Sequence, residues 1–125
     1  MEDEDFHTLQ HPESYVIDKS GEIFFAVFDQ EVIGTAAMIP VSDKVFELAK
    51  MAVRKDFQGR GVGKLLLKRC ISFAKERNAL EIFLLTNDVL KPALNLYLSS
   101  GFVLNDEYDD ERYERGNTKM HLILS

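Results

Sequence analysis

Three glycines stand at alternate positions in QGRGVGKLL, residues 58–66, directly ahead of a leucine-rich run. The spacing of glycines in nucleotide-binding loops follows from the geometry of their ligands, so two common loops can be tested against this segment. A P-loop at this place needs a glycine instead of Gln58 and a Ser or Thr instead of Leu65. A dinucleotide fingerprint that begins at Gly59 or Gly61 needs a third glycine, which the sequence lacks at the required position. The loop therefore holds another ligand, or none.

Composition narrows the class of protein. A chain of 125 residues fits one domain, residues 1–125, with a modest core. The formal net charge of -6 argues against a general affinity for nucleic acid or for anionic membranes. The N-terminus, MEDEDF, lacks the basic-then-apolar order of a signal peptide, and no apolar run approaches the roughly 20 residues of a membrane span. Cys70 is the single cysteine, and the three histidines lack partners at ligand spacing, so no metal site is predicted. A reducing cytoplasm is the expected location.

Hydrophobic periodicity predicts the element order β-β-β-α-β-α-β-β, a mixed α/β sheet. The strands are predicted at residues 23–28, 32–39, 45–53, 81–86, 102–104 and 118–124. The first helix is predicted from Val62 to about Arg77, because apolar residues recur there at spacings of three and four. The second helix follows the possible N-cap Asn87 and ends at Gly101. Residues 11–18 are expected to keep part of a short N-terminal helix.

The glycine loop joins a predicted strand to the helix that starts at Val62, so the first N–H groups of that helix point into the loop. A helix N-terminus of this kind binds phosphate. The three glycines remove Cβ atoms that would block a close approach of the backbone, and they permit the positive φ of a concave nest of amides. The side chains of Arg60 and Lys64 add positive charge suited to a diphosphate. From the loop alone, a strand-to-helix turn without any ligand stays the alternative.

Two motifs, one after the other along the chain, resemble those of the GNAT superfamily of N-acetyltransferases. Residues 58–63 match the superfamily signature Q/R-x-x-G-x-G/A, placed between the strand end Lys50-Met51-Ala52-Val53 and a leucine-rich helix. Farther along the chain, the family's helix A-x-x-L-Y-x-x-x-G-F is similar to Ala93-Leu94-Asn95-Leu96-Tyr97 and Gly101-Phe102, preceded by Asn87. The resemblance covers residues 23–124, nearly the whole chain.

This resemblance implies an acetyl-CoA-dependent N-acetyltransferase in which a primary amine attacks the thioester directly in a ternary complex. Acetyl-CoA is expected where two neighbouring parallel strands splay apart, with backbone N–H groups holding the thioester carbonyl and the pantetheine arm. The residues assigned to acetyl-CoA are Met51, Ala52, Val53, Gln58, Gly59, Arg60, Gly61, Val62, Gly63, Lys64 and Asn87. The capping role of Asn87 explains that residue nearly as well.

Two residues are candidates for proton transfer. Tyr97 matches the position at which many family members keep the acid that protonates the leaving thiolate, and a phenol with a pKa of about 10 suits that task. A core aromatic is the alternative, because Tyr97 shares the apolar side of its helix with Leu94 and Leu98. Glu47 is the candidate base for the acceptor ammonium, since it precedes Val53 by an even number of residues in the strand that leads to the acetyl group. A solvent-facing strand residue is the alternative for Glu47.

Only about twenty residues precede Ile23, fewer than in most family members, so the chain is expected to be N-terminally short. The wall of the acceptor site usually comes from that region, and a partner subunit in a homodimer is one way to complete it. The acceptor itself, a small molecule or a peptide, stays open. A CoA-binding regulatory module without turnover and an interaction domain without a ligand are the competing functions. Cys70 lies on the apolar stripe of the first helix, which predicts a buried structural thiol and not a nucleophile.

Overall fold

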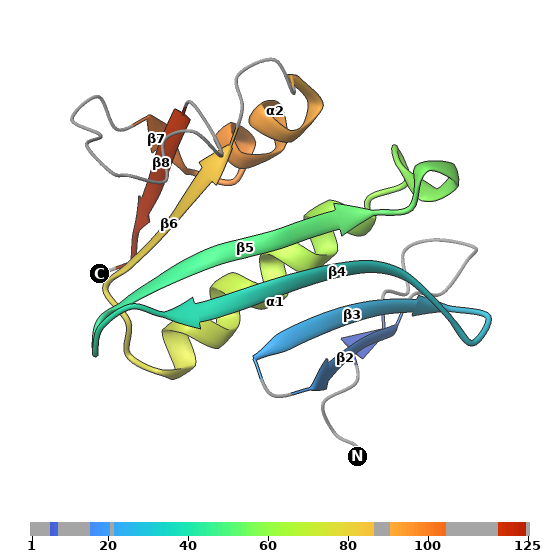
Figure 1. Cartoon of the computed structure of the whole chain (residues 1–125), viewed down its shortest axis with the longest axis horizontal. Coiled ribbons are helices and arrows are strands. Elements are labelled where there is room, and N and C mark those ends of the chain that lie inside the picture. Colours follow the sequence, from blue (N-terminus) through green and yellow to red (C-terminus); the bar gives the residue numbers. More distant parts are fainter. Residues whose placement is uncertain (1–5, 8–15, 21, 87–90, 105–117, 125) are drawn as a thin grey trace. The chain divides into compact units, whose positions relative to one another are not determined.

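The computed structural model describes residues 6–7, 16–20, 22–86, 91–104 and 118–124 of the chain, and its elements are labelled in Figure 1. Backbone packing divides the chain into two units. The first comprises Met1–Ile39 and Leu48–Phe73, and the second comprises Pro40–Glu47 and Ala74–Ser125. The assignment of residues 1–125 to one domain stays a prediction.

The first unit is built on a sheet with mainly antiparallel pairing. Its strands follow one another in the order β1 (Phe6–His7), β2 (Val16–Ser20), β3 (Ile23–Phe28), β4 (Glu31–Pro40) and β5 (Val45–Val53). The pairs β1–β2, β2–β3 and β3–β4 are antiparallel. The three strands predicted from the sequence in this region are confirmed to within one residue at each end.

Strand β2 corrects the expected N-terminal helix. Residues 16–18 of that prediction are strand, paired antiparallel with β3. The β-branched residues Val16 and Ile17 favour extended backbone, and Ile17 is fully buried. Pairing with β3 therefore prevails over any local helical tendency. Residues 11–15 of the same prediction lie outside the described part of the chain.

The β3–β4 connection is a two-residue hairpin turn. Phe28 pairs with Glu31, and the residues between them, Asp29 and Gln30, have φ angles of 54° and 68°. Positive φ at both central positions is what a type I′ turn requires, and this turn matches the twist of the flanking strands. The turn lies between the strands predicted at residues 23–28 and 32–39, with Glu31 now the first residue of β4.

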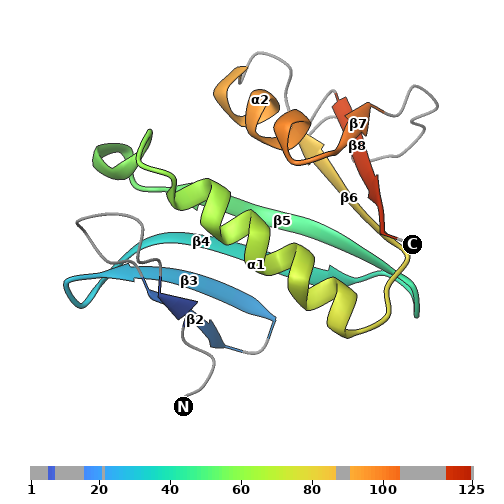
Figure 2. The same ribbon diagram turned by 180° about the vertical axis from the view of Figure 1, so that it is seen from behind.

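Helix α1 (Val62–Glu76) covers one face of this sheet, as the two opposite views in Figures 1 and 2 show. Its predicted start is confirmed, and its end lies one residue before the predicted one. The ring of Phe73 meets that of Phe24 edge-on at 5.4 Å between centroids. A Cβ added to Gly34 in β4 would lie 3.0 Å from Leu66 Cδ1 and 3.2 Å from Val62 Cγ1. Glycine at position 34 therefore lets the first turns of α1 approach the sheet closely.

Strand β5 does not keep a regular two-residue alternation. Phe46, Glu47 and Leu48 are buried in succession, and the exposed residues that follow are Lys50 and Ala52. Lys50 has a φ of 54°, which is left-handed and rare for a residue with a side chain in a strand. Residues 49–53 nevertheless alternate between half-buried and exposed. The sequence argument that an even separation places Glu47 and Val53 on one face stays a prediction.

The second unit contains the start of β5 and the last strands of the chain. Its elements are β6 (Glu81–Thr86), α2 (Lys91–Ser99), β7 (Val103–Leu104) and β8 (Thr118–Ile123). Residues 45–47 of β5 pair in parallel with residues 81–83 of β6, whereas β8 lies antiparallel to both β6 and β7. This arrangement confirms the predicted mixed sheet.

The core of the second unit gathers around β6, β8 and the end of α2. Its buried members include Ile82, Leu84, Tyr97, Phe102 and Met120. The helix ends as predicted at a glycine, because Gly101 has a φ of 105° and the N–H of Phe102 donates to the carbonyl of Tyr97. Leu98, which the sequence placed on the apolar side, is 45% exposed. The apolar stripe of this short helix is therefore narrower than expected.

Candidate functional site

The glycine loop lies between the end of β5 and the start of α1. A short 3-10 helix, η1 (Lys55–Phe57), precedes the loop. Gly59 and Gly61 have φ angles of 81° and 90°, whereas Gly63 lies in the first turn of α1. A Cβ added to Gly59 would meet no atom within 4 Å, so the space above this glycine is open. The open space at Gly59 and the left-handed backbone of both glycines suit the concave nest of amides that an anion needs.

The N-terminus of α1 adds its dipole to this loop. Its first turn contains no acidic residue, and the side chain of Lys64 is exposed. Val62 is buried, so its assignment to the cofactor stays a prediction. The amides of a first helical turn have no partner one turn earlier, which makes them donors for a phosphate. The loop residues therefore fit the diphosphate of coenzyme A by the chemistry of their donors.

Gln58 has a partner within the loop. Its side-chain Nε2 donates a hydrogen bond of 3.0 Å to the carbonyl oxygen of Val53, the last residue of β5. The bond closes the segment between strand and loop, so the structure gives Gln58 a role in shaping the loop. Its assignment to the cofactor stays a prediction.

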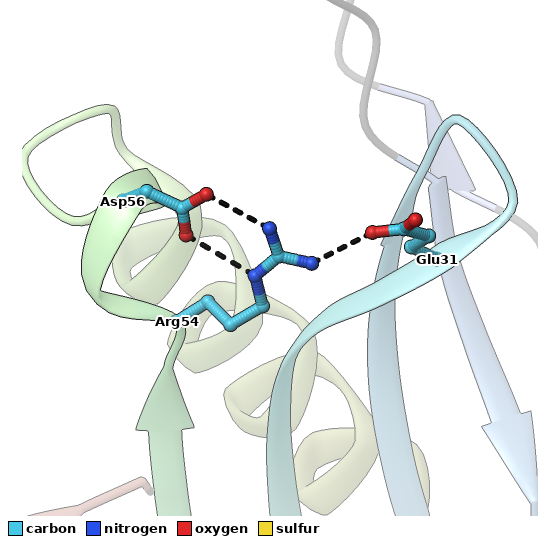
Figure 3. Close-up of polar contacts among 3 residues, drawn as sticks. All are labelled: Glu31, Arg54 and Asp56. Atoms are coloured by element: carbon cyan, nitrogen blue, oxygen red, sulfur yellow. Dashed lines mark hydrogen bonds and ion pairs between the residues drawn. The ribbon is translucent and has the colours of Figure 1, made fainter.

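An ion-pair network that the sequence reasoning missed lies beside the loop (Figure 3). Arg54 donates from Nε and Nη2 to the two carboxylate oxygens of Asp56, at 3.1 and 2.8 Å. Its Nη1 donates to Glu31 Oε1 at 2.8 Å. The hydrogen bonds of Arg54 hold the pKa of Asp56 below its usual value, and the two carboxylates raise the pKa of Arg54. The spacing of Arg54 and Asp56 was a local signal for the first pair, but nothing in the sequence pointed to Glu31.

The predicted thioester-binding segment occupies the last three residues of β5. Ala52 is exposed, and Met51 and Val53 are half-buried. The parallel ladder between β5 and β6 comprises three residue pairs, the last being Glu47↔Phe83. The cofactor segment 51–53 thus follows the point at which this ladder ends. The roles of its N–H groups stay predictions.

Glu47 is buried, with 8% of its surface exposed. The alternative that it is a solvent-facing strand residue is therefore wrong. Flanked by the buried Phe46 and Leu48, it lies where both faces of β5 are covered. A carboxyl group is seldom buried without a specific reason, because desolvation penalises its charged form.

Tyr97 is also buried, at 6% exposure, and its ring lies 5.9 Å from that of Phe102. This contact shows that the ring packs in the core of the second unit, as the alternative reading held. The hydroxyl group can still serve as an acid, so the catalytic role stays a prediction. Of the residues predicted for the site, the loop and segment 51–53 belong to the first unit, and Glu47 and Tyr97 belong to the second. Asn87 lies outside the described residues.

Comparison with known proteins identifies the family of the chain. The model of the acetyltransferase (GNAT) family matches residues 2–102. The chain belongs to the GNAT family. Among curated GNAT relatives, N-acetyltransferase 8B of Rattus norvegicus is 28% identical over 100 residues, which cover 76% of this chain and 45% of the relative. N-acetylaspartate synthetase of Danio rerio is 36% identical over 100 residues, covering 78% of this chain and 36% of the relative. The chain thus spans less than half the length of these relatives.

Solved GNAT structures share the fold. A GNAT acetyltransferase from Staphylococcus aureus Mu50 superposes with a TM-score of 0.73 at 27% identity, covering 82% of this chain and 67% of the other. A GNAT acetyltransferase from Elizabethkingia anophelis, solved with acetyl-CoA bound, also gives 0.73, at 23% identity and with 82% and 75% coverage. The predicted mixed α/β GNAT-like fold is therefore confirmed.

A metal-ligand cluster and a membrane-spanning helix are both absent from the described residues. No group of three or more His, Cys, Asp or Glu side chains within them could hold a metal ion. Within the same part of the chain, no helix has the length and apolar character needed to cross a bilayer. The predicted cytoplasmic location stays a prediction.

Cys70 is fully buried on α1, and burial raises the pKa of its thiol to about 12, although the nearby charge of Arg69 acts in the opposite direction. The folded state thus keeps a proton that the unfolded state releases above a pKa of about 9. The contribution of the buried thiol to the free energy of unfolding is fully present below pH 9. It is lost as the pH rises towards 12, by at most about 1.4 kcal/mol per pH unit.

We expect the free energy of unfolding in urea, measured from pH 7 to 10.5, to show this loss in the wild type and a flatter profile in Cys70→Ala. Parallel profiles would show that the thiol is not linked to folding.

Proposed function

We propose that this GNAT-family chain transfers the acetyl group of acetyl-CoA to a primary amine, by direct attack of the amine in a ternary complex. The observation that carries the proposal is the loop before α1, in which Gly59 and Gly61 are left-handed and the space above Gly59 is open. Family membership supports the reaction class. The amine acceptor, small molecule or peptide, and a homodimeric assembly remain further proposals.

The residues that would hold acetyl-CoA form two groups. The N–H groups of the glycine loop and of the first turn of α1, with the charges of Arg60 and Lys64, suit the diphosphate. The N–H groups of residues 51–53 suit the pantetheine arm and the thioester carbonyl. When bound, acetyl-CoA supplies an activated acyl group with a thiolate as leaving group.

Glu47 is our candidate for the group that takes a proton from the acceptor ammonium. An amine attacks only in its neutral form, so a base in reach of it raises the reactive fraction near neutral pH. Glu47→Gln is expected to lower kcat about 100-fold, within the usual contribution of a general base. The acidic limb of its pH-rate profile should also change. A variant that keeps the wild-type acidic limb would remove Glu47 from the mechanism.

A thermal-shift titration with CoA and acetyl-CoA tests the binding part of the proposal. A ligand that binds only the folded state adds about 2.7 kcal/mol of stability at 100 times its Kd, so the unfolding midpoint should rise with ligand concentration. Release of free thiol in the presence of amines then tests turnover. The absence of any shift would contradict the proposed function, and a shift without thiol release would favour a CoA-binding module.

The panel of amines should include free amino acids, peptides and polyamines. Two of the relatives carry the name N-acetylaspartate synthetase, from Danio rerio and Rattus norvegicus, at 36% and 37% identity. Amino acids are on this ground one acceptor class to test first.

A CoA-binding module without turnover is the second candidate function. It is favoured by the packing of Tyr97, the candidate acid, as a core aromatic against Phe102.

A further inference from the structure

Two contacts join the β3–β4 turn to η1, and both lie outside the glycine signature. The first is the ion pair of 2.8 Å between Glu31, at the start of β4, and Arg54. The second is an aromatic pair, in which the ring centroids of Phe28 and Phe57 are 5.5 Å apart. The turn is thus attached to the segment that leads into the loop at two places, one charged and one apolar.

The Phe57 ring connects this attachment to the loop. The guanidinium carbon of Arg54 lies 5.2 Å from the ring centroid, and that of Arg60 lies 5.1 Å from it. Cation–π contacts of this length orient a guanidinium over a ring face. One aromatic ring therefore contacts both the arginine of the ion-pair network and the arginine inside the glycine loop.

The guanidinium of Arg54 is held by two carboxylates. Three nitrogen atoms of Arg54 donate to the carboxylates of Asp56 and Glu31, so two negative charges face its single positive charge (Figure 3). Such a guanidinium is poorly suited to bind a phosphate as well. Arg60 lies within the loop itself, exposed at its surface, and it interacts with the charge of Asp56 as well. Arg54 therefore holds the structure, whereas Arg60 is the arginine that we assign to the ligand because of its place in the loop.

We propose that Arg54 is a positioning residue for the diphosphate site. It fixes the β3–β4 turn and η1 to each other, and this keeps Phe57 in place beneath the guanidinium of Arg60. Arg60 then loses less side-chain freedom when it contacts the diphosphate of coenzyme A. The inference rests on the proposed function, because it assumes that coenzyme A is the ligand of the loop.

Glu31 and Arg60 provide the sharpest test, since Glu31 contacts Arg54 and lies outside the glycine signature. We would measure the Kd of CoA by titration calorimetry for wild type, Glu31→Gln, Arg60→Gln and the double variant. Loss of the ion pair between Glu31 and Arg54 should raise the Kd of CoA about three- to tenfold, which corresponds to the cost of ordering one long side chain. In the Arg60→Gln background the same Glu31 substitution should have almost no effect, because the side chain that it orients is gone.

The control cycle pairs Arg60→Gln with Glu22→Gln, a change of the same kind in the first unit and outside the network. This pair should show independent effects on the Kd. Independent effects of Glu31→Gln and Arg60→Gln would overturn the inference. Failure of the wild type to bind CoA would instead overturn the proposed function, so the two failures are distinguishable.

Substitutions at Arg54 separate positioning from plain stability. Arg54→Met removes every ion pair, whereas Arg54→Lys keeps the charge but loses the two-pronged contact with Asp56. Positioning predicts a raised KM for acetyl-CoA with unchanged kcat and unchanged KM for the acceptor, and a smaller rise for Lys than for Met. A lowered unfolding midpoint without any change in the KM for acetyl-CoA would show that Arg54 only stabilises the fold. Should Arg54→Met fail to fold, the Glu31 cycle still decides the question.

Discussion

Replacing Gly59 by alanine should weaken the binding of CoA at least tenfold while the protein stays folded. The φ of 81° costs an L-residue roughly 1–2 kcal/mol of backbone strain, so a modest fall in unfolding free energy is expected. The larger effect comes from the new methyl group, which would occupy the open space that we assign to the diphosphate. Calorimetric titration with CoA, at a temperature below the unfolding midpoint of the variant, measures this change in Kd.

Gly101→Ala is the matched control for this substitution. Gly101 also has a left-handed φ, of 105°, and an added Cβ would lie only 3.2 Å from Leu122 Cδ1. We expect this variant to lose at least as much stability as Gly59→Ala and to keep its affinity for CoA. Equal losses of affinity in both variants would mean that strain alone accounts for the effect, and the loop would no longer be a diphosphate site.

Tyr97→Phe should lower kcat by 100-fold or more, within the range of a general acid, with little change in the Kd of CoA. Phenylalanine keeps the ring that packs against Phe102, so stability should change by no more than about 1 kcal/mol, the usual net value of one hydrogen bond. Steady-state rates of thiol release with a saturating acceptor, combined with CoA titrations, measure both quantities.

Phe102→Leu offers the comparison for Tyr97. It removes the ring partner of Tyr97 but leaves the phenol hydroxyl in place. We expect a lower unfolding midpoint from the loss of a fully buried ring and a kcat much closer to wild type than that of Tyr97→Phe. If Tyr97→Phe retains full kcat, Tyr97 is a core aromatic and another group protonates the thiolate.

The parts of the fold that were predictable depend on short-range signals. Helix α1 begins at the predicted Val62 because the apolar spacing and the preceding glycines act within one or two turns. Gly101 ends α2 as predicted, since only glycine adopts its φ without strain. The turn between β3 and β4 lies at the predicted break in the apolar pattern, residues 29–31, although the turn is one residue shorter than that break.

Features of the site that depend on residues far away in the chain could not be predicted from the sequence. The burial of Glu47 between the buried Phe46 and Leu48 does not follow from a two-residue alternation, and nothing in the local sequence indicates the left-handed φ of Lys50. Strand β2 forms because β3 is available to pair with it. For β2 the deciding partner is therefore another segment of the chain.

The sequence by itself determined the family signature, the glycine loop and the helix behind it, because backbone preference and periodicity act over a few neighbouring residues. Only the tertiary structure decided what surrounds that loop. Arg54 and Glu31 are 23 residues apart in the chain, and their ion pair exists because the β3–β4 hairpin returns its turn to the end of β5. Strand pairing brings such distant residues together, and no local sequence pattern encodes these contacts. They connect the loop to the rest of the first unit.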